Sequence, residues 1–152
     1  MTIRRLTSDD VAALSEYFAA VDADAEAVRF FHPHPFTADE ASRVCDPARR
    51  DLYFAAWDGD TIIGYSMLRG WEEGYEVPSF GVCVRPQRRG TGVGREMTRH
   101  AVGQCRSLGV RTLRLTVYKT NCRAAQLYRD LGFDLRELDD ERFVGLLHLA
   151  AA

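Results

Sequence analysis

The segment between Tyr75 and Gly109 limits the fold more than any other part of the chain. An apolar run, Tyr75–Val84, leads into a turn with glycines at positions 90, 92 and 94. Apolar residues then recur at the spacing of one helix face, at Val93, Met97, Ala101, Cys105 and Leu108. This pattern predicts a buried strand, a glycine turn and an amphipathic helix that ends at Gly109. The fold therefore has to join a strand directly to a helix at that turn.

The glycine turn is also rich in arginine. Its basic residues are Arg85, Arg88, Arg89, Arg95 and Arg99, and only Glu96 opposes them. Glycines let the backbone approach a ligand, and the first N–H groups of a helix bind phosphate. Arginines add charge-assisted hydrogen bonds to a diphosphate. A plain turn with solvated arginines is the structural alternative, but three alternating glycines exceed what a turn needs. The sequence therefore predicts a phosphate-binding turn.

Two other phosphate-binding motifs are excluded. A P-loop requires Gly-Lys-Ser/Thr, whereas the one lysine of the chain, Lys119, lies in another segment. A dinucleotide fingerprint requires a third glycine at the position that Arg95 occupies.

A second informative segment is Asn121–Phe133. Apolar residues at positions 124, 125, 127, 128 and 131 supply one face of a predicted helix, which ends at Gly132. Tyr128 lies seven residues after Asn121, two helical turns along the same side. Taken alone, such a tyrosine is typical of core packing.

The remaining segments predict a mixed sheet covered by helices. A hairpin is expected from Leu52–Trp57 and Thr61–Leu68 around Asp58-Gly59-Asp60. Further strands are expected at Ile3–Thr7, Leu113–Val117, Asp134–Leu138 and Phe143–Leu149. Two N-terminal helices are expected after Ser8-Asp9-Asp10 and after the capping box that begins at Thr37. No linker or repeat interrupts this order, so residues 1–152 are predicted to form a single α/β (α+β) domain.

Composition excludes several classes of protein. The net charge of −2 and the pI of about 6.1 are not those of a nucleic-acid-binding domain. No apolar run approaches the roughly 20 residues of a membrane-spanning helix. The N-terminus also lacks the apolar core of a secretion signal, which favours a cytoplasmic protein.

Cysteine and histidine positions do not predict a metal site. Cys45, Cys83, Cys105 and Cys122 lack zinc-site spacing, and a cytosolic protein keeps them reduced. His32-Pro33-His34 looks like a pair of ligands, but no third ligand is evident, so we expect a rigid loop without metal.

Together the two motif segments resemble the GCN5-related N-acetyltransferase (GNAT) superfamily. Arg89-Gly90-Thr91-Gly92-Val93-Gly94 is similar to its acyl-CoA motif, Arg/Gln-x-x-Gly-x-Gly/Ala. The second segment is similar to its Asn-x-x-Ala-x-x-Leu-Tyr-x-x-x-Gly-Phe helix, matched at Asn121, Ala124, Leu127, Tyr128, Gly132 and Phe133. The resemblance implies the GNAT acyltransferase fold. That fold has a mostly antiparallel sheet of six to seven strands, a splayed and bulged fourth strand, and about four helices.

The resemblance also implies a site for acetyl-CoA as co-substrate. Backbone groups of Val82, Cys83 and Val84 would pair with the pantetheine arm and the acetyl carbonyl, and Asn121 would contact the arm. Amides of the turn would hold the pyrophosphate; its residues are Arg89, Gly90, Thr91, Gly92, Val93, Gly94 and Arg95. Tyr128 would protonate the departing thiolate as general acid.

The general base is less defined by the sequence. Ribosomal-protein alanine acetylases place a glutamate five residues before the helix asparagine, where this chain has Thr116, which argues against that subgroup. Glu76 is the first candidate, with Glu72, Glu73, Ser79 or a water chain as alternatives.

The expected acceptor pocket lies between the N-terminal helices and the loop before the fourth strand. Phe31, Trp71 and Tyr75 are the expected substrate contacts, together with Phe30, His32 and His34. Aromatic rings with carboxylates suit a cationic amine.

The expected function is acetyl transfer from acetyl-CoA to a primary amine of a small molecule or peptide. A second possible function is that of a sensor that binds acyl-CoA without turnover. A third is that of an interaction protein that has lost the cofactor. No nucleic-acid or membrane partner is expected, and a homodimer is left open.

Overall fold

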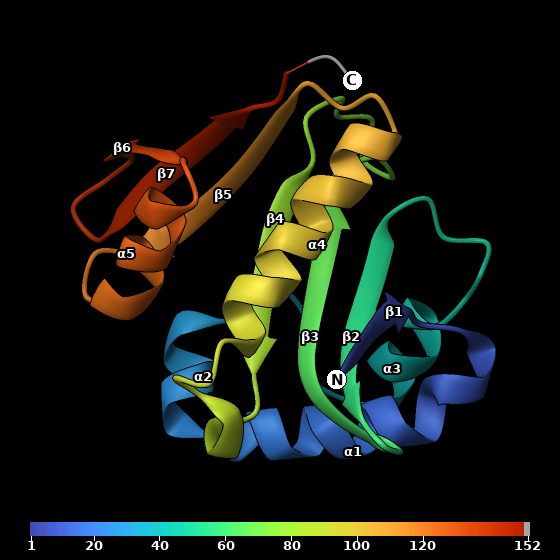
Figure 1. The fold of residues 1–152 in the computed structure, drawn as a ribbon. Coiled ribbons are helices and arrows are strands. Elements are labelled where there is room, and N and C mark those ends of the chain that lie inside the picture. The colour runs from blue at the N-terminus through green and yellow to red at the C-terminus, as the bar shows by residue number, and fades with distance from the viewer. Residues whose placement is uncertain (151–152) are drawn as a thin grey trace.

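The computed structural model describes residues 1–150, in which seven strands form one sheet (Figure 1). The strands are β1 (Thr2–Arg5), β2 (Leu52–Asp58), β3 (Thr61–Arg69), β4 (Ser79–Val84), β5 (Thr112–Tyr118), β6 (Asp134–Glu137) and β7 (Arg142–His148). Their order in the sheet is β1-β2-β3-β4-β5-β7-β6. Only β4 and β5 are parallel. The mixed, mostly antiparallel sheet expected from the sequence is confirmed.

Five α-helices cover the two faces of the sheet. They are α1 (Val11–Asp22), α2 (Ala25–Phe30), α3 (Ala38–Val44), α4 (Val93–Ser107) and α5 (Cys122–Asp130). Side chains of α1 and α3 pack with Tyr65 and Met67 in one apolar cluster. Side chains of α4 and α5 pack with Leu68 and Phe80 on the other side. No helix of residues 1–150 has the length and apolar character needed to cross a bilayer.

Helix α2 and the start of β4 are the largest departures from the sequence prediction. Helix α2 was not predicted, because it has only six residues and its N-cap residue, Asp24, makes no capping hydrogen bond through its side chain. Strand β4 begins at Ser79 rather than Tyr75, because the preceding segment is a turn. There the amides of Glu73 and Tyr75 both donate to the Gly70 carbonyl, at 3.2 and 2.9 Å. The strand begins directly after the buried Pro78.

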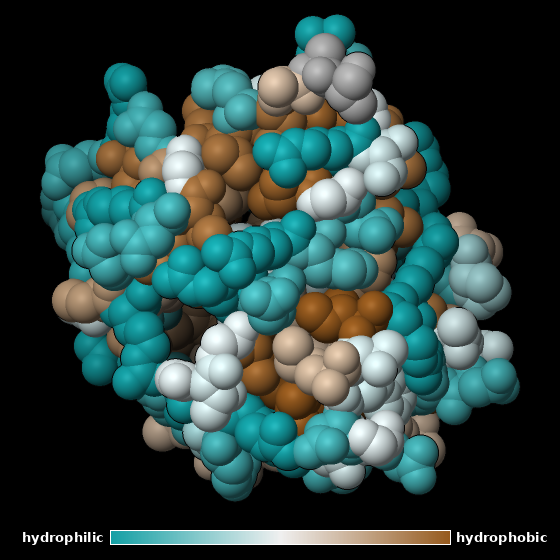
Figure 2. All heavy atoms as spheres, viewed as in Figure 1, coloured by the Kyte–Doolittle hydropathy of each residue, from teal (hydrophilic) through white to brown (hydrophobic). Residues whose placement is uncertain are grey.

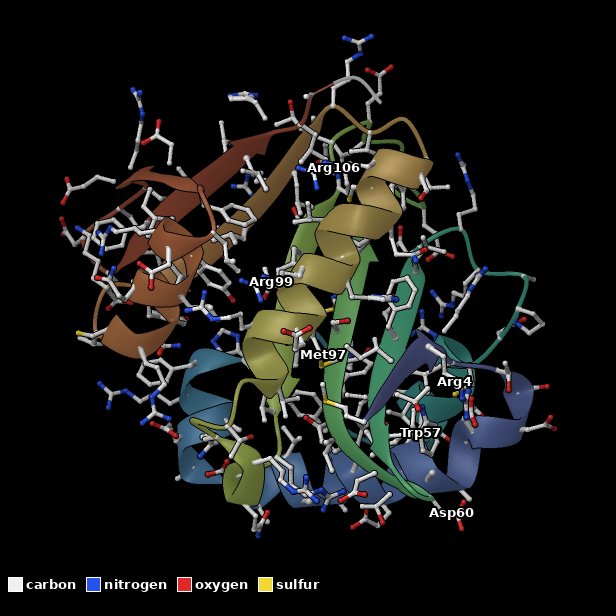
Figure 3. All side chains as sticks on the ribbon, in the orientation of Figure 1. Arg4, Trp57, Asp60, Met97, Arg99 and Arg106 are labelled. Carbon is white, nitrogen blue, oxygen red and sulfur yellow. The ribbon has the colours of Figure 1, made fainter. Side chains whose placement is uncertain are left out.

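The N-terminal turn is fixed by a capping box. The buried Asp10 carboxylate accepts hydrogen bonds from the Thr7 amide (2.8 Å) and from both terminal nitrogens of the Arg4 guanidinium (2.8 and 2.9 Å). The guanidinium of Arg4 also stacks 4.4 Å from the Trp57 ring, and Figure 3 shows the two side chains together. Strand β1 is thereby joined to α1 and β2.

The sheet separates between β4 and β5. The two strands pair only at Ser79 and Arg114, where the Arg114 amide donates to the Pro78 carbonyl at 3.0 Å. Beyond that point they diverge, as the resemblance implied (Figure 1). The implied bulge is absent from the β3–β4 ladder, because its register runs unbroken from Arg69–Ser79 to Gly64–Val84. The register shift lies instead in β2, between Ala56 and Trp57.

The pairing of β4 with β3 leaves main-chain groups facing the gap. The Arg85 amide donates to the Ile63 carbonyl at 2.8 Å, so odd-numbered residues of β4 bond to β3. Even-numbered residues therefore direct their N–H and C=O groups to the opposite edge. For Val82 and Val84 that edge faces the gap. Because β5 diverges there, their N–H and C=O groups are left without a strand partner, and no bulge is needed to free them.

Candidate active site

A cavity of about 900 Å³ occupies the gap between β4 and β5. It is lined by β4, the glycine turn, α2, β5 and α5, and it includes most of the predicted cofactor residues. Those that line it are Val82, Cys83, Val84, Arg89, Gly90, Gly92, Gly94, Arg95 and Asn121, together with Tyr128. Thr91 and Val93 do not line it. Val93, the first residue of α4, is buried in a cluster with Ile63 and Met97, and the Thr91 hydroxyl donates to the Arg88 carbonyl.

The glycine turn has the conformation that its sequence predicts. Gly90 and Gly92 have φ of 74° and 94°, a region that residues with a side chain rarely adopt. Gly92 is also the N-cap of α4, whose first N–H groups have no acceptor within the helix. A side-chain carbon at either glycine would meet nothing within 4 Å, so the backbone is open to a ligand.

The arginines of the turn pair with acids from distant segments. Arg89 binds Asp24 and, at 2.7 Å, Glu26. Arg88 pairs with Asp58, and Arg95 lies 3.6 Å from Asp130. No local sequence pattern marks these acids, because each lies 30 or more positions from its arginine. The charge available to a phosphate at this turn is therefore smaller than the count of arginines implies.

Tyr128 lies in an apolar part of this cavity. Its ring meets Phe80 and Phe133 edge-on, with ring centroids 6.5 and 5.7 Å away. Burial, with a smaller contribution from Cys83, raises the pKa of the Tyr128 hydroxyl well above its usual range. The group is therefore protonated at neutral pH and can serve as a proton donor.

Strand β4 and helix α5 are anchored by two further side chains. The buried Tyr17 hydroxyl donates to the Cys83 carbonyl at 2.8 Å and so fixes β4 to α1. Asn121 is the N-cap of α5, and its side-chain oxygen accepts from the Ala124 amide at 3.4 Å. Its side-chain NH2 group is not used by the cap and remains available to a ligand.

A second cavity of about 400 Å³ adjoins the first. Residues lining both cavities are Phe30, Phe31, Phe80, Gly81, Thr116 and Val117. The predicted substrate residues Phe31 and Tyr75 line the second cavity, together with His32. Trp71 does not, because its ring packs against the apolar cluster of Leu68 and Phe80.

The candidate bases occupy different environments. Glu73 and Glu76 are both exposed, and Glu76 lines neither cavity. Glu72 is held by Arg49 at 2.8 Å and by the Arg50 amide at 3.2 Å. Glu73 and Ser79 line the second cavity, and Thr116 stands where the two cavities meet.

The two loop histidines do not converge. His32 hydrogen bonds to the Tyr118 hydroxyl at 2.9 Å, whereas His34 bonds to the Tyr65 hydroxyl at 2.8 Å. Burial lowers the pKa of His34, which keeps its ring neutral. Within residues 1–150, no three His, Cys, Asp or Glu side chains are grouped as metal ligands.

Comparison with known proteins identifies the family. The model of the acetyltransferase (GNAT) family matches residues 16–133. The chain belongs to this family. Both sequence motifs and the gap between β4 and β5 lie wholly or largely within the matched span.

Two curated relatives of this GNAT chain differ in their named substrates. The mycothiol acetyltransferase of Geodermatophilus obscurus is 32% identical over 125 residues, which cover 73% of this chain but 40% of that protein. The [ribosomal protein bS18]-alanine N-acetyltransferase of Escherichia coli K12 is 36% identical over 101 residues, which cover 66% of this chain and 67% of that protein. The chain thus spans well under half of the mycothiol enzyme and two thirds of the other.

A solved structure with bound acetyl-CoA has the same fold. The structure of yncA from Salmonella typhimurium with its cofactor acetyl-CoA superposes with a TM-score of 0.78 and 20% sequence identity. The match covers 100% of this chain and 95% of that one. The fold predicted from the two motifs is thereby confirmed.

Proposed function

We propose that this chain is an acetyl-CoA-dependent N-acetyltransferase acting on a primary amine. One observation carries the proposal. The gap beside β4 combines unpaired main-chain groups of Val82 and Val84, positive-φ glycines at a helix N-terminus, and a buried tyrosine. Membership of the family, and a relative of the same fold solved with acetyl-CoA, support it.

The cavity residues fit acetyl-CoA along its length. Amides from Gly90 to Arg95 would bind the pyrophosphate, with the α4 N-terminus behind them. Main-chain groups of Val82 and Val84 would hydrogen bond to the pantetheine arm, much as an adjacent strand would. When bound, acetyl-CoA supplies the thioester carbon that an amine attacks.

Residues around that carbon would stabilise the transition state. The Val84 amide would donate to the developing oxyanion as the amine nitrogen bonds to carbon. As the carbon–sulfur bond breaks, Tyr128 would give its proton to the thiolate. A thiol and a tyrosine have reference pKa values of about 8.5 and 10. Burial raises the pKa of the Tyr128 hydroxyl, so the proton would leave it only as negative charge develops on the sulfur beside it.

The incoming amine must lose a proton before or during attack. Of the glutamates considered, Glu73 lines the second cavity and Glu76 does not. We therefore assign the proton acceptor to Glu73, directly or through water, in place of Glu76. The amine would approach from the second cavity and reach the thioester between Gly81 and Thr116.

Release of free thiol from acetyl-CoA tests the proposal across a panel of amines and N-terminal peptides. We expect amine-dependent release with matching formation of an N-acetyl product by mass spectrometry. Tight coenzyme binding without release by any acceptor would favour the non-catalytic sensor. Absence of coenzyme binding in calorimetry would refute both functions.

A further inference from the structure

The arginines that line the two cavities differ in whether a carboxylate balances their charge. Five of them are partly buried, and four of these face a carboxylate: Arg88, Arg89, Arg95 and Arg142. The fifth, Arg69, has no carboxylate within ion-pair distance among residues 1–150. A partly buried guanidinium that lacks a counter-ion and faces a cavity is a binding element for an anion.

Arg69 is held in place but not neutralised. One terminal nitrogen donates to the Pro33 carbonyl at 2.9 Å and lies 3.9 Å from the Met67 sulfur. These contacts use a small part of its five-donor fork. The positive charge of Arg69 also opposes the burial that raises the pKa of Tyr53 and Tyr65, so its field extends into this face of the sheet.

The second cavity also contains one carboxylate without a partner. Glu73 lies in the turn before β4 and forms no ion pair within the described part of the chain. Arg142, by contrast, donates to Asp139 at 3.0 and 2.8 Å. The cavity therefore presents one free positive group and one free negative group to a ligand.

Arg69 lies close to the proposed point of acetyl transfer. In the sheet it stands opposite Ser79, which is two residues before Gly81, where the cavities meet. Two residues of a strand span roughly 7 Å. An anion bound by Arg69 would therefore lie near the proposed position of the reacting amine, within the span of one small molecule.

The rest of the cavity sets the size and polarity of that molecule. Its volume of about 400 Å³ is near the lower end of small-molecule sites. Phe30, Phe31, Tyr75 and Tyr118 supply aromatic walls. These surroundings suit one apolar side chain.

We propose that the acceptor is a free α-amino acid with an apolar side chain, whose carboxylate binds Arg69 and whose ammonium group approaches Glu73. This inference rests on the proposed acetyltransferase function and deepens it. A peptide acceptor has its carboxylate many residues from its N-terminal amine and would gain nothing from Arg69. The second cavity thus favours a free amino acid over a peptide.

The test compares acceptors that differ only in the carboxylate. Phenylalanine, leucine and methionine are each paired with the amine that lacks the carboxylate, and with a peptide beginning with that residue. We expect at least one amino acid to exceed both partners in kcat/KM by about tenfold or more. In Arg69→Gln that preference should disappear, while the rate with the decarboxylated amine and the KM for acetyl-CoA stay within about twofold.

Two further variants separate recognition from folding. Arg69→Lys keeps the charge and should retain part of the preference. Arg106→Gln removes an exposed arginine at the far end of α4 and should leave it unchanged (Figure 3). Equal losses for carboxylated and decarboxylated acceptors in Arg69→Gln would make Arg69 a structural anchor of Pro33, and this would overturn the inference.

A binding measurement makes the result independent of turnover. Calorimetry of the coenzyme complex with N-acetylphenylalanine and N-acetylphenethylamine should show tighter binding of the carboxylate, dependent on Arg69. If thiol release fails but this preference holds, the proposed function fails and the site assignment stands. If release succeeds and no carboxylated ligand is preferred, the inference fails alone.

Discussion

Tyr128 is enclosed by aromatic rings and yet lines the cavity between β4 and β5. Its side chain is 6% exposed, and the rings of Phe80 and Phe133 fix its orientation from two sides. A hydroxyl placed in this way has little freedom to move, so it can meet a leaving sulfur without reorganisation.

Replacing Tyr128 with phenylalanine should separate proton donation from packing. Loss of a general acid typically costs a factor of roughly 100 or more in rate. We therefore expect kcat in Tyr128→Phe to fall by about that factor, while calorimetry gives a nearly unchanged Kd for acetyl-CoA. Tyr53→Phe removes a buried hydroxyl outside both cavities and is the matched control. Equal losses in kcat and affinity would make Tyr128 a packing residue.

Asp10 gives a stability prediction that depends on pH. Its hydrogen bonds from Arg4 outweigh burial and lower the pKa of the carboxyl. A lowered folded-state pKa adds stability above the unfolded value, near pH 3.9, and that stability is lost as pH falls through the folded value. In urea unfolding at pH 7, Asp10→Asn should therefore lose about 1–2 kcal/mol.

The difference between Asp10→Asn and the wild type should shrink as the pH falls below about 4. Asp9→Asn, at an exposed neighbour, should unfold like the wild type throughout. A constant difference from pH 7 to pH 3 would mean that shape, and not charge, governs the effect.

At the scale of elements, the turn between β4 and α4 combines strain with open space. Gly92 has φ of 94°, and a side chain there would meet no atom within 4 Å. We expect Gly92→Glu to abolish acetyl-CoA binding in calorimetry, because it adds strain and a negative charge beside the predicted pyrophosphate site.

Gly103→Glu makes the same change at an unstrained position of α4. Its added carbon also meets nothing within 4 Å. This variant should bind coenzyme normally and gain about 0.5–1 kcal/mol of stability from helix propensity. Retention of binding in Gly92→Glu would refute the placement of the pyrophosphate.

Elements with a long apolar pattern and a clear end were predicted correctly, whereas short elements without such a pattern were not. α4 was predicted because its apolar stripe extends over four turns and ends at a glycine. α2 was missed because it has six residues and no side-chain cap. The start of β4 was placed too early, because Tyr75 and Val77, just before Pro78, look like strand residues but lie outside the strand.

At the scale of the whole molecule, the four cysteines report on how tightly the chain is packed. Burial raises the pKa of Cys45, Cys83 and Cys105 to about 11 in each case. Cys122 is exposed and lines the first cavity.

Thiol labelling should therefore distinguish one cysteine from three. At pH 7.5, iodoacetamide should modify Cys122 rapidly and the buried thiols slowly, because the thiolate is the reacting species. Peptide mass mapping checks the site, and unfolding in urea should expose all four. Acetyl-CoA, which has no free thiol to consume the reagent, should slow the fast reaction, and Cys122→Ser should remove it. Rapid labelling of Cys83 would contradict the closed packing of β4.

The site was only partly predictable from the sequence. The glycine turn, Asn121 and Tyr128 carry local patterns, and the fold brings them to one cavity. Glu76 and Trp71 were chosen by their position along the chain, and neither lines the second cavity; Trp71 packs against the cluster of Leu68 and Phe80 instead. The partners of Arg89 and the isolation of Arg69 depend on elements distant in sequence, which no local pattern records.

The single contact between β4 and β5 has a mechanical consequence. On the two sides of this seam, strands β1–β4 and β5–β7 share one ladder position, and apolar side chains of α4, β5 and α5 pack in one cluster. Figure 2 shows apolar atoms at the surface beside α4. Acetyl-CoA bound in this gap would hydrogen bond to β4 as a further strand does, and would hold the two parts of the sheet together. The two parts of the sheet should thus move least against each other while the coenzyme is bound, and most just after it leaves, so that their relative mobility changes with every catalytic cycle.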